Sequence, residues 1–124
     1  MPKYITSNLL HYKIGNTKYL IEVTNTSKYG YCFKGVKDNF NGVICDDFIE
    51  DIPLTPEILE KNGWKKDKDG YFNDSYHIRL CKSNTNYAAY KVVNKSIVWL
   101  RAVENVSDLQ HLLFGLDISL KIEV

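Results

Sequence analysis

The sequence predicts an α+β fold, and three observations lead to this prediction. Segments in which apolar and polar residues alternate, rich in Tyr, Val and Ile, fill most of the chain and indicate antiparallel strands. Two other segments carry the apolar spacing and the end signals of helices. The composition, 44% hydrophobic and 25% charged, is that of a globular protein. We therefore expect a single domain over 1–124, with a β-rich part at 1–52 and a helix–meander–helix part at 53–124.

The β-rich part begins with several short segments of strand character. They span residues 9–15, 17–24, 29–36 and 42–50. Gly15-Asn16 marks a turn between the first two. In the second segment, alternation places Tyr19, Ile21 and Val23 on one face. Four or five short strands within about 50 residues predict a small, strongly bent sheet of the size of an SH3-like barrel.

A short helix is expected over residues 56–62. Thr55 is a favourable N-cap, and Pro56 suits the first helical position because the N–H group it lacks would have no partner there. Gly63 supplies the left-handed residue that ends a helix. A helix of two turns is not stable alone, so we expect it to pack on a sheet.

An antiparallel meander of about four strands is expected next. The strand-like segments are 64–68, 71–73, 76–81, 87–93 and 96–103. Turns are indicated by Asp69-Gly70 and Asn94-Lys95. An alternative arrangement is one continuous sheet that wraps both helices.

The chain is expected to close with a helix and an edge strand. Ser107 and Gln110 form the pattern of a capping box, and Gly115 is expected to end the helix. The apolar stripe of this helix is Leu109, Leu112, Leu113 and Leu116. The edge strand would span 118–122, with Ile118, Leu120 and Ile122 facing inward. An edge strand can pair with a second copy of itself, which would make a homodimer.

The charge and cysteine patterns limit the classes of partner. The 16 basic and 15 acidic residues give a net charge of +1, which argues against non-specific binding of duplex DNA. Cys32, Cys45 and Cys81 are widely spaced, which is typical of reduced thiols in a cytoplasmic protein. No segment approaches the roughly 18 apolar residues of a membrane span, and no signal-peptide pattern is present, so we expect no membrane partner.

The residues that could perform catalysis do not form a recognisable pattern. His11, His77 and His111 lie in different segments without the spacing of a metal site. Cys81 and His77 are four residues apart, which in a strand separates them by roughly 13 Å, too far for a nucleophile and its base. No glycine-rich phosphate-binding loop occurs. We therefore expect a protein that is not an enzyme and needs no metal or cofactor.

The second half of the chain combines aromatic and cationic residues. The set comprises Trp64, Lys65, Lys66, Tyr71, Tyr76, Arg79, Tyr87, Tyr90, Lys91, Trp99 and Arg101. Aromatic rings stack on nucleobases, and cations neutralise phosphate, so these residues suggest a surface for a nucleotide or a nucleic acid. The candidate ligand-binding residues are Trp64, Lys66, Tyr76, Arg79, Tyr87, Tyr90, Lys91 and Arg101. Arg79 is the best candidate for the phosphate contact, because its planar guanidinium group can bind two oxygens.

A purely structural interpretation of the same residues is also open. In it Trp64 and Trp99 belong to the core, the tyrosines pack across strands, and the cations keep the outer face of the sheet soluble.

Three segments resemble a known family. They are "IPLTPEILEKNGWKKDKDGYF", "VENVSDLQHLLFGL" and, more weakly, "HYKIGNTKY". In this order and spacing they are similar to segments of small proteins from phages, prophages and mobile elements of Bacteroidetes. The chain departs from that pattern after Phe114, where Gly115 and "LDISLKI" replace the usual ending. The resemblance implies a setting, the cytoplasm of a bacterial host, and no mechanism.

Two functions follow as expectations. The first is a non-enzymatic phage or mobile-element accessory protein that binds and sequesters a small, anionic, nucleotide-like signal of host defence. The second is an adaptor or inhibitor that binds a host or phage protein through exposed Tyr-rich strands.

Overall fold

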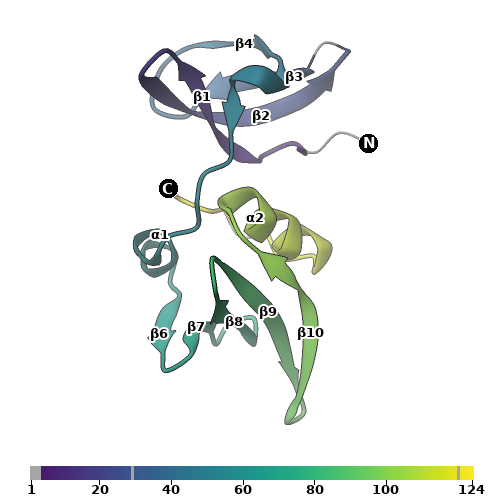
Figure 1. The fold of residues 1–124 in the computed structure, drawn as a ribbon. Coiled ribbons are helices and arrows are strands. Elements are labelled where there is room, and N and C mark those ends of the chain that lie inside the picture. The colour runs from purple at the N-terminus through teal and green to yellow at the C-terminus, as the bar shows by residue number, and fades with distance from the viewer. Residues whose placement is uncertain (1–3, 29, 120) are drawn as a thin grey trace. The chain divides into compact units, whose positions relative to one another are not determined.

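The protein folds into two compact units. The computed structural model describes residues 4–28, 30–119 and 121–124. The units are Met1–Ile52 and Pro53–Val124, and each contains one five-stranded antiparallel sheet (Figure 1). The α+β class is confirmed. The alternative of one continuous sheet is wrong, because the chain leaves the first sheet after Glu50 and passes through Pro53 into a helix.

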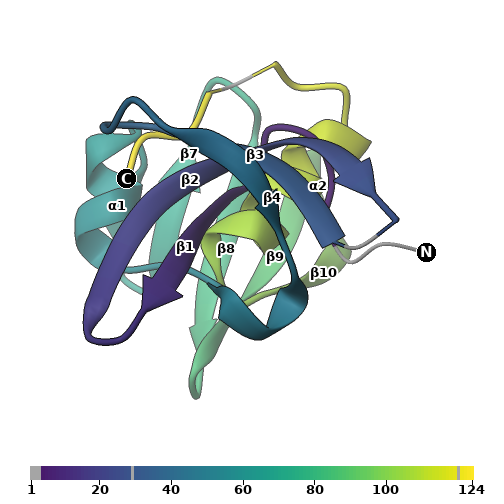
Figure 2. The same ribbon diagram turned by 90° about the horizontal axis from the view of Figure 1, so that it is seen from above.

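The first unit is a bent meander with a returning fifth strand. Its strands are β1 (Leu9–Ile14), β2 (Thr17–Ser27), β3 (Gly30–Gly35), β4 (Asn41–Ile44) and β5 (Ile49–Glu50), with a 3₁₀ turn η1 (Asp46–Phe48) before β5. The strand order is β4-β3-β2-β1-β5, and Figure 2 shows β1 to β4 from above. The 3₁₀ turn η1 connects β4 at one edge of the sheet to β5 at the other edge.

The turns of the first unit follow the expected residues in one place and depart from them in another. Gly15 has a positive φ of 59°, and Ile14 pairs with Thr17 across the tight turn. The strand expected over 42–50 is wrong in its middle part, because β4 ends at Ile44. The N–H of Phe48 donates to the carbonyl of Cys45 at 3.2 Å, which closes the 3₁₀ turn instead of extending the strand.

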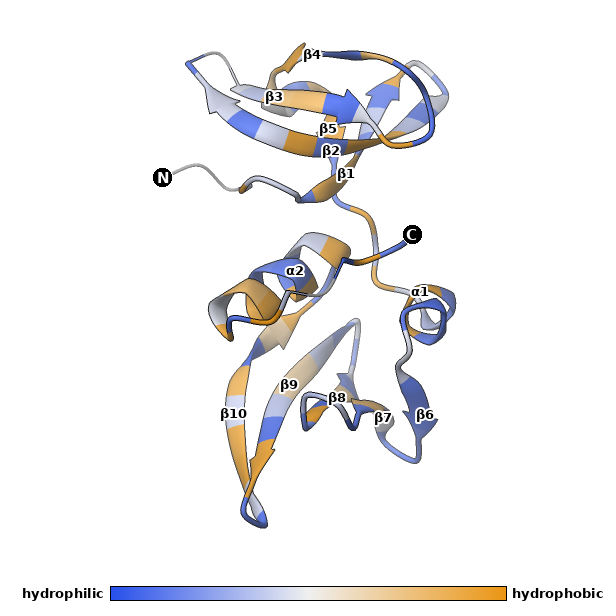
Figure 3. Ribbon diagram, turned by 180° about the vertical axis from the view of Figure 1, so that it is seen from behind, coloured by the Kyte–Doolittle hydropathy of each residue, from blue (hydrophilic) through white to orange (hydrophobic). Residues whose placement is uncertain are grey.

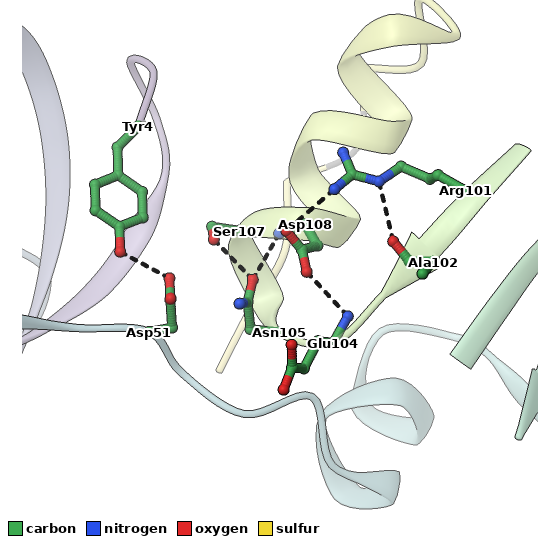
Figure 4. A network of polar contacts seen from close by, with 8 residues as sticks. All are labelled: Tyr4, Asp51, Arg101, Ala102, Glu104, Asn105, Ser107 and Asp108. Atoms are coloured by element: carbon green, nitrogen blue, oxygen red, sulfur yellow. Dashed lines mark hydrogen bonds and ion pairs between the residues drawn. The ribbon is translucent and has the colours of Figure 1, made fainter. Parts of the chain in front are cut away.

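One apolar cluster holds the first unit together. Its buried members are Tyr4, Leu10, Ile21, Val23, Tyr31, Phe33 and Ile44. Ile21 and Val23 lie on one face of β2, as the alternation predicts. The hydroxyl of Tyr4 donates to Asp51 Oδ1 at 2.9 Å, which joins the N-terminal segment to the end of the unit (Figure 4).

The second unit is a meander with one helix before it and one after it. Its helices are α1 (Pro56–Lys61) and α2 (Val106–Gly115), and its strands are β6 (Lys65–Asp67), β7 (Gly70–Asn73), β8 (Ile78–Ser83), β9 (Asn86–Val93) and β10 (Ser96–Val103). The sheet order is β10-β9-β8-β7-β6, so every strand pairs with its neighbour in the sequence. The meander has five strands, one for each of the five strand-like segments of the sequence, although the expected count was about four. Helix α2 packs on the sheet.

Helix α1 has the ends that its sequence predicts. Thr55 Oγ1 accepts a hydrogen bond from the N–H of Ile58 at 3.3 Å, as an N-cap should. Gly63 has a φ of 86°, and the N–H of Trp64 donates to the carbonyl of Leu59 at 3.0 Å. These contacts form a Schellman motif, which satisfies the last carbonyls of the helix.

The hairpin between β6 and β7 is shifted by one residue from the expected turn. Asp67 pairs with Gly70, so the loop is Lys68-Asp69 and Gly70 belongs to the strand. The reason lies in the packing of Gly70 on β8. A Cβ atom at this position would collide with the carbonyl group of Leu80, so only glycine fits there.

Helix α2 begins two residues earlier than expected. Asn105 is its N-cap, and Asn105 Oδ1 accepts from the N–H of Asp108 at 2.8 Å (Figure 4). Ser107, expected to be the cap, lies inside the helix and donates its hydroxyl to the same oxygen at 2.8 Å. Asp108 Oδ2 in turn accepts from the N–H of Glu104 at 3.0 Å.

The end of α2 also differs from the prediction. Gly115 is the last helical residue, Leu116 is the C-cap, and the left-handed residue that stops the helix is Asp117, with a φ of 58°. The N–H of Ile118 donates to the carbonyl of Leu113 at 2.9 Å, which completes a Schellman motif. In the predicted apolar stripe, Leu109, Leu112 and Leu113 are buried, and Leu116 is half-buried.

The C-terminal tail is not an edge strand over the residues that the structure describes. Leu120 lies outside those residues, and 118–119 and 121–124 have no strand. The tail instead binds the end of α1: Asn62 Nδ2 donates to the carbonyl of Glu123 at 2.6 Å, and Asn62 Oδ1 accepts from the N–H of Glu123 at 2.7 Å. The C-terminal edge strand, one of the reasons for expecting a homodimer, is therefore not present over the described residues.

Candidate functional site

A row of aromatic and cationic residues crosses all strands of the second sheet. Paired residues of an antiparallel ladder point to the same face. The ladder pairs Lys65 with Phe72, Phe72 with Arg79, Arg79 with Tyr90, and Tyr90 with Trp99. We call these five residues the aromatic row. They lie on the face opposite the buried Leu80 and Ala89, which we call the outer face.

The aromatic row is accessible to a ligand along its length. Trp99 is 60% exposed, Lys65 is exposed, and Phe72, Arg79 and Tyr90 are half-buried. Neighbouring strands lie about 4.8 Å apart, so the five residues extend over about 19 Å. The row therefore presents exposed and half-buried side chains from five neighbouring strands, three of them rings on which planar bases can stack.

Arg79 has an internal partner on this face. Its guanidinium group forms an ion pair with Asp67 Oδ2. Gly70 pairs with Asp67 on one side and with Cys81 on the other, so no side chain stands between Asp67 and β8. Because a carboxylate already neutralises Arg79, the expected phosphate contact requires that this ion pair opens or that the phosphate binds both Arg79 and Lys65.

Two of the predicted ligand-binding residues lie in the core. Trp64 is 2% exposed and Tyr87 is 3% exposed, and both face the side of the sheet opposite the aromatic row. The ring of Tyr87 packs edge-on against Tyr71 at 6.4 Å between centroids, and Lys82 lies over it at 4.7 Å. The indole N–H of Trp64 has no acceptor among the described residues. For these two positions the prediction of a ligand contact is corrected: alternation along the strands turns them inward.

Four more predicted residues are separated from the aromatic row. Lys91 Nζ donates to the carbonyl of Tyr76 at 2.8 Å, and Tyr76 lies in the turn before β8 instead of on the strand. Lys66 pairs with the buried Tyr71 and so belongs to the opposite face. Arg101 forms an ion pair with Asp108 of α2 at 3.2 Å (Figure 4). Of the eight candidates, the structure brings only Arg79 and Tyr90 together.

A bulge explains why Arg101 leaves the outer face. Trp99 pairs with Tyr90, whereas Arg101 pairs with Ala89, so the register shifts between them at Leu100. The extra residue turns Arg101 toward α2. Simple alternation, which would place 99 and 101 on one face, therefore fails at this point.

Phe72 is the residue of the aromatic row that sequence reasoning missed, and Trp99 was left open between core and surface. Phe72 follows from alternation, since the apolar neighbour Tyr71 is buried and Phe72 must then face outward, whereas Val98 beside Trp99 is 50% exposed and gives no such signal. A further signal is the charge distribution. Between Asp74 and Glu104 the chain has five cations, Arg79, Lys82, Lys91, Lys95 and Arg101, and no acidic residue. Strands β8 to β10 therefore favour an anionic ligand.

The first unit carries a second candidate site, an aromatic groove. Four rings follow one another in a closed circuit: Tyr12 and Tyr19 at 6.4 Å, Tyr19 and Phe40 at 5.6 Å, Phe40 and Phe33 at 5.5 Å, and Phe33 and Tyr12 at 5.5 Å. With residues 41–43 of β4 they line a groove of about 500 Å³. β4 is an edge strand, so a peptide could lie along it.

A charged cluster lies at the β1–β2 hairpin of the first unit. Lys13 and Lys18 contact Glu50 at 3.3 and 3.0 Å, and these hydrogen bonds lower the pKa of Glu50. Burial, together with the charge of Lys18, lowers the pKa of His11. In this cluster the two lysines share one carboxylate, and all three side chains are exposed or half-buried.

Metal sites, membrane spans and related proteins add no further candidate. Within the described residues no group of His, Cys, Asp and Glu could hold a metal ion. In the same part of the chain no helix has both the length and the apolar character needed to cross a membrane. Comparison of the chain with family models, with curated proteins and with solved structures found no match.

Proposed function

We propose that the chain is a non-enzymatic binding protein that holds a nucleotide ligand on the outer face of its second sheet. The observation that carries this proposal is the aromatic row, in which three aromatic rings and two cations from five strands share one exposed face. Base–aromatic stacking contributes about 1–3 kcal/mol per base and tolerates different bases. The absence of acidic residues between Asp74 and Glu104 supports an anionic ligand.

The geometry of the row favours a ligand with more than one base. Phe72 and Tyr90 are separated by two strand spacings, about 10 Å, with Arg79 between them. A single base covers one ring, whereas two bases joined by a phosphate could stack on both rings and place the phosphate over Arg79. We therefore favour a short oligonucleotide, linear or cyclic, as the ligand class.

The biological setting is a separate part of the proposal and rests on the resemblance alone. A phage or mobile-element accessory protein in the cytoplasm of a bacterial host could sequester such a nucleotide signal and thereby weaken a defence response. Stoichiometric binding without turnover would suffice for this role.

A ligand screen followed by matched variants tests the proposal. Thermal unfolding is measured with mononucleotides, with linear and cyclic dinucleotides and with a short single-stranded DNA. A ligand at 100 times its Kd should add about 2.7 kcal/mol of stability. For any ligand found, Phe72→Ala and Tyr90→Ala should each weaken binding by about 1–3 kcal/mol. Phe114→Ala is the control, because Phe114 is 74% exposed on α2 and outside the row.

The outcome can contradict the proposal in two ways. If none of these ligands raises the unfolding temperature, the outer face does not bind nucleotides. If Phe114→Ala weakens binding as much as the row variants do, a nucleotide binds elsewhere on the chain.

A second candidate function is an adaptor that binds a protein segment. The specific observation in its favour is the aromatic groove beside edge strand β4. Flat rings with hydroxyl groups suit an extended peptide whose backbone carbonyls accept hydrogen bonds from Tyr12 and Tyr19. Fluorescence anisotropy with labelled extended peptides tests this function. Tyr19→Ala should abolish any binding seen, and unchanged binding would exclude the groove.

A further inference from the structure

The β9–β10 hairpin extends past the rest of its sheet as a two-stranded ribbon. β8 begins at Ile78, which pairs with Lys91. Next to this pair, the N–H of Val92 donates to the carbonyl of His77 at 2.9 Å, so among the described strands only the last pair, Val93 with Ser96, has no third segment beside it. Figure 3 shows apolar segments along both strands of the hairpin up to its hydrophilic turn.

The ribbon exposes large apolar side chains on both of its faces. Val93 is 43% exposed, Ile97 65%, Val98 50% and Trp99 60%. Val93 and Ile97 lie at the turn end of the hairpin, whereas Val98 and Trp99 pair with residues of β9 that also pair with β8, and we call these four residues the ribbon tip. A monomeric soluble protein rarely leaves such side chains adjacent unless they meet an apolar partner. Three of the four are aliphatic and offer neither a ring for stacking nor a hydrogen-bonding group, so the proposed nucleotide site makes no use of them.

Three cations lie on or beside the ribbon tip, and one of them, Arg101, is ion-paired with Asp108 of α2 at 3.2 Å, which leaves Lys91 and Lys95 as the source of a positive field. Lys95 is exposed in the turn, and Lys91 and Arg101 lie on the two strands. Lys91 donates to the backbone carbonyl of Tyr76 at 2.8 Å, and it has no ion pair with a carboxylate among the residues that the structure describes. The nearest acidic residues along the chain are Asp74 and Glu104. The ribbon therefore combines an apolar tip with a positive field.

These charges disfavour a second copy of the chain as the partner. β10 is an edge strand, and an antiparallel twin centred on Val98 would place Lys95 opposite Arg101. Like charges directly opposite one another destabilise a ladder. The bulge at Leu100 further interrupts the edge. A partner that is both apolar and anionic fits better.

We propose that the ribbon tip docks on an anionic lipid bilayer. Its aliphatic side chains would enter the boundary of the acyl chains, Trp99 would lie at the level of the headgroups, and Lys91 and Lys95 would bind anionic headgroups. The sequence predicts no membrane partner because it holds no spanning segment, but peripheral docking does not require one. This site goes beyond the proposed nucleotide function.

Sedimentation with lipid vesicles tests the proposal. The full chain should bind vesicles of phosphatidylcholine and phosphatidylserine, should not bind phosphatidylcholine alone, and should dissociate as salt is raised. Tryptophan emission should shift to shorter wavelength on binding. Trp99 would cause this shift, because Trp64 is already buried in the free protein.

Variants identify the docking residues. The double variant Ile97→Ser with Val98→Ser should weaken binding at least about tenfold, because two exposed apolar side chains no longer enter the bilayer. Lys95→Ser should weaken it about fivefold, the effect of one basic residue near an anionic surface. Val43→Ser and Phe114→Ser are controls, since both residues are exposed and lie on other elements. A far-ultraviolet spectrum confirms that each variant folds.

Several results would overturn the proposal. These are no binding to either vesicle, equal binding to both, or equal losses from the ribbon and control variants. Phe72→Ala should leave vesicle binding unchanged, because Phe72 lies three strands from β10. A negative result with vesicles therefore leaves the nucleotide proposal standing, and a negative result with nucleotides leaves the membrane proposal standing.

Discussion

Trp64 and Trp99 show how well the burial of a single residue can be predicted from the sequence. Both are candidates for the core by composition, yet Trp64 is 2% exposed and Trp99 is 60% exposed. The difference follows from the face of the sheet on which each lies, since α2 packs on the sheet and no described element covers the outer face. Placement in the core is therefore correct for Trp64 and wrong for Trp99.

The two tryptophans should respond to truncation in opposite ways. Trp99→Ala should weaken nucleotide binding by about 1–3 kcal/mol through the loss of stacking, with little change in the free energy of unfolding. Trp64→Ala should cost about 3–5 kcal/mol of stability, because it leaves a cavity in the core. Denaturant titration and ligand titration of both variants check this. A large loss of stability in Trp99→Ala would show that the outer face is covered.

Asp67 should limit the affinity of the outer face for anions. Asp67→Asn removes a negative charge and releases the guanidinium group of Arg79. We expect nucleotide binding to tighten at least about tenfold, the gain from one additional hydrogen bond to a charged group. Arg79→Ala should weaken it. If calorimetric titration shows that Asp67→Asn binds no better than the parent, then Arg79 is not a phosphate contact.

At the scale of elements, local signals predict the strands and helices better than their ends. The helix over 56–62 and the turn at Asn94-Lys95 could be predicted because capping and turn chemistry depend on neighbouring residues only. The start of α2 could not be predicted, because Asn105 and Ser107 are both favourable N-cap residues. In the structure Asn105 Oδ1 accepts from the N–H of Asp108, and the hydroxyl of Ser107 donates to the same oxygen.

The cap of α2 is open to a direct stability test. Asn105→Ala should cost about 0.5–2 kcal/mol, since the N–H of Asp108 loses its acceptor. Asn105→Ser keeps an acceptor and should cost less. Urea denaturation of the two variants measures both values. Equal losses would mean that Asn105 acts through packing instead of capping.

Gly70 and Gly115 provide a matched pair of glycine substitutions. Gly70→Ala should destabilise the protein by more than about 1 kcal/mol, because the new methyl group would meet the backbone of β8. Gly115→Ala has open space around it and lies in the last turn of α2, so it should be neutral or stabilising by up to about 1 kcal/mol. Thermal unfolding compares them, and the same effect at both positions would contradict the strand position of Gly70.

At the scale of the whole molecule, the division after residue 52 coincides with the change from strand segments to helix signals. Alternation along a single strand does not show which distant residues share a face or form an ion pair. The bulge at Leu100 changes which residues share a face, and the ion pair of Arg79 with Asp67 depends on a glycine in the strand between them. Of the eight residues that the sequence suggests for a ligand site, the structure therefore places two, Arg79 and Tyr90, in the aromatic row.

The two units should respond to opposite extremes of pH. In the first unit, His11 and Glu50 have lowered pKa values, so their stabilising contributions are present above the unfolded-state values of 6.5 and 4.5 and are lost as pH falls below them. In the second unit, burial raises the pKa values of Tyr71 and Tyr87. Their contribution is present below pH 10 and is lost as pH rises.

Fluorescence and circular dichroism can separate these responses, because both tryptophans lie in the second unit. We expect acid to change the far-ultraviolet spectrum before tryptophan emission, and alkali to change tryptophan emission first. Tyr71→Phe should reduce the alkaline effect. Simultaneous changes in both signals at both extremes would show that the units unfold as one.

The most direct test of the nucleotide-binding proposal is a titration of the ¹⁵N-labelled protein with a short single-stranded DNA, followed by amide shifts. We predict that the shifted signals cluster at Phe72, Arg79, Tyr90 and Trp99 and their strand neighbours, and that they move with one common affinity. Shifts confined to the groove around Tyr12 and Phe40, or no shifts at all, would contradict nucleotide binding on the outer face.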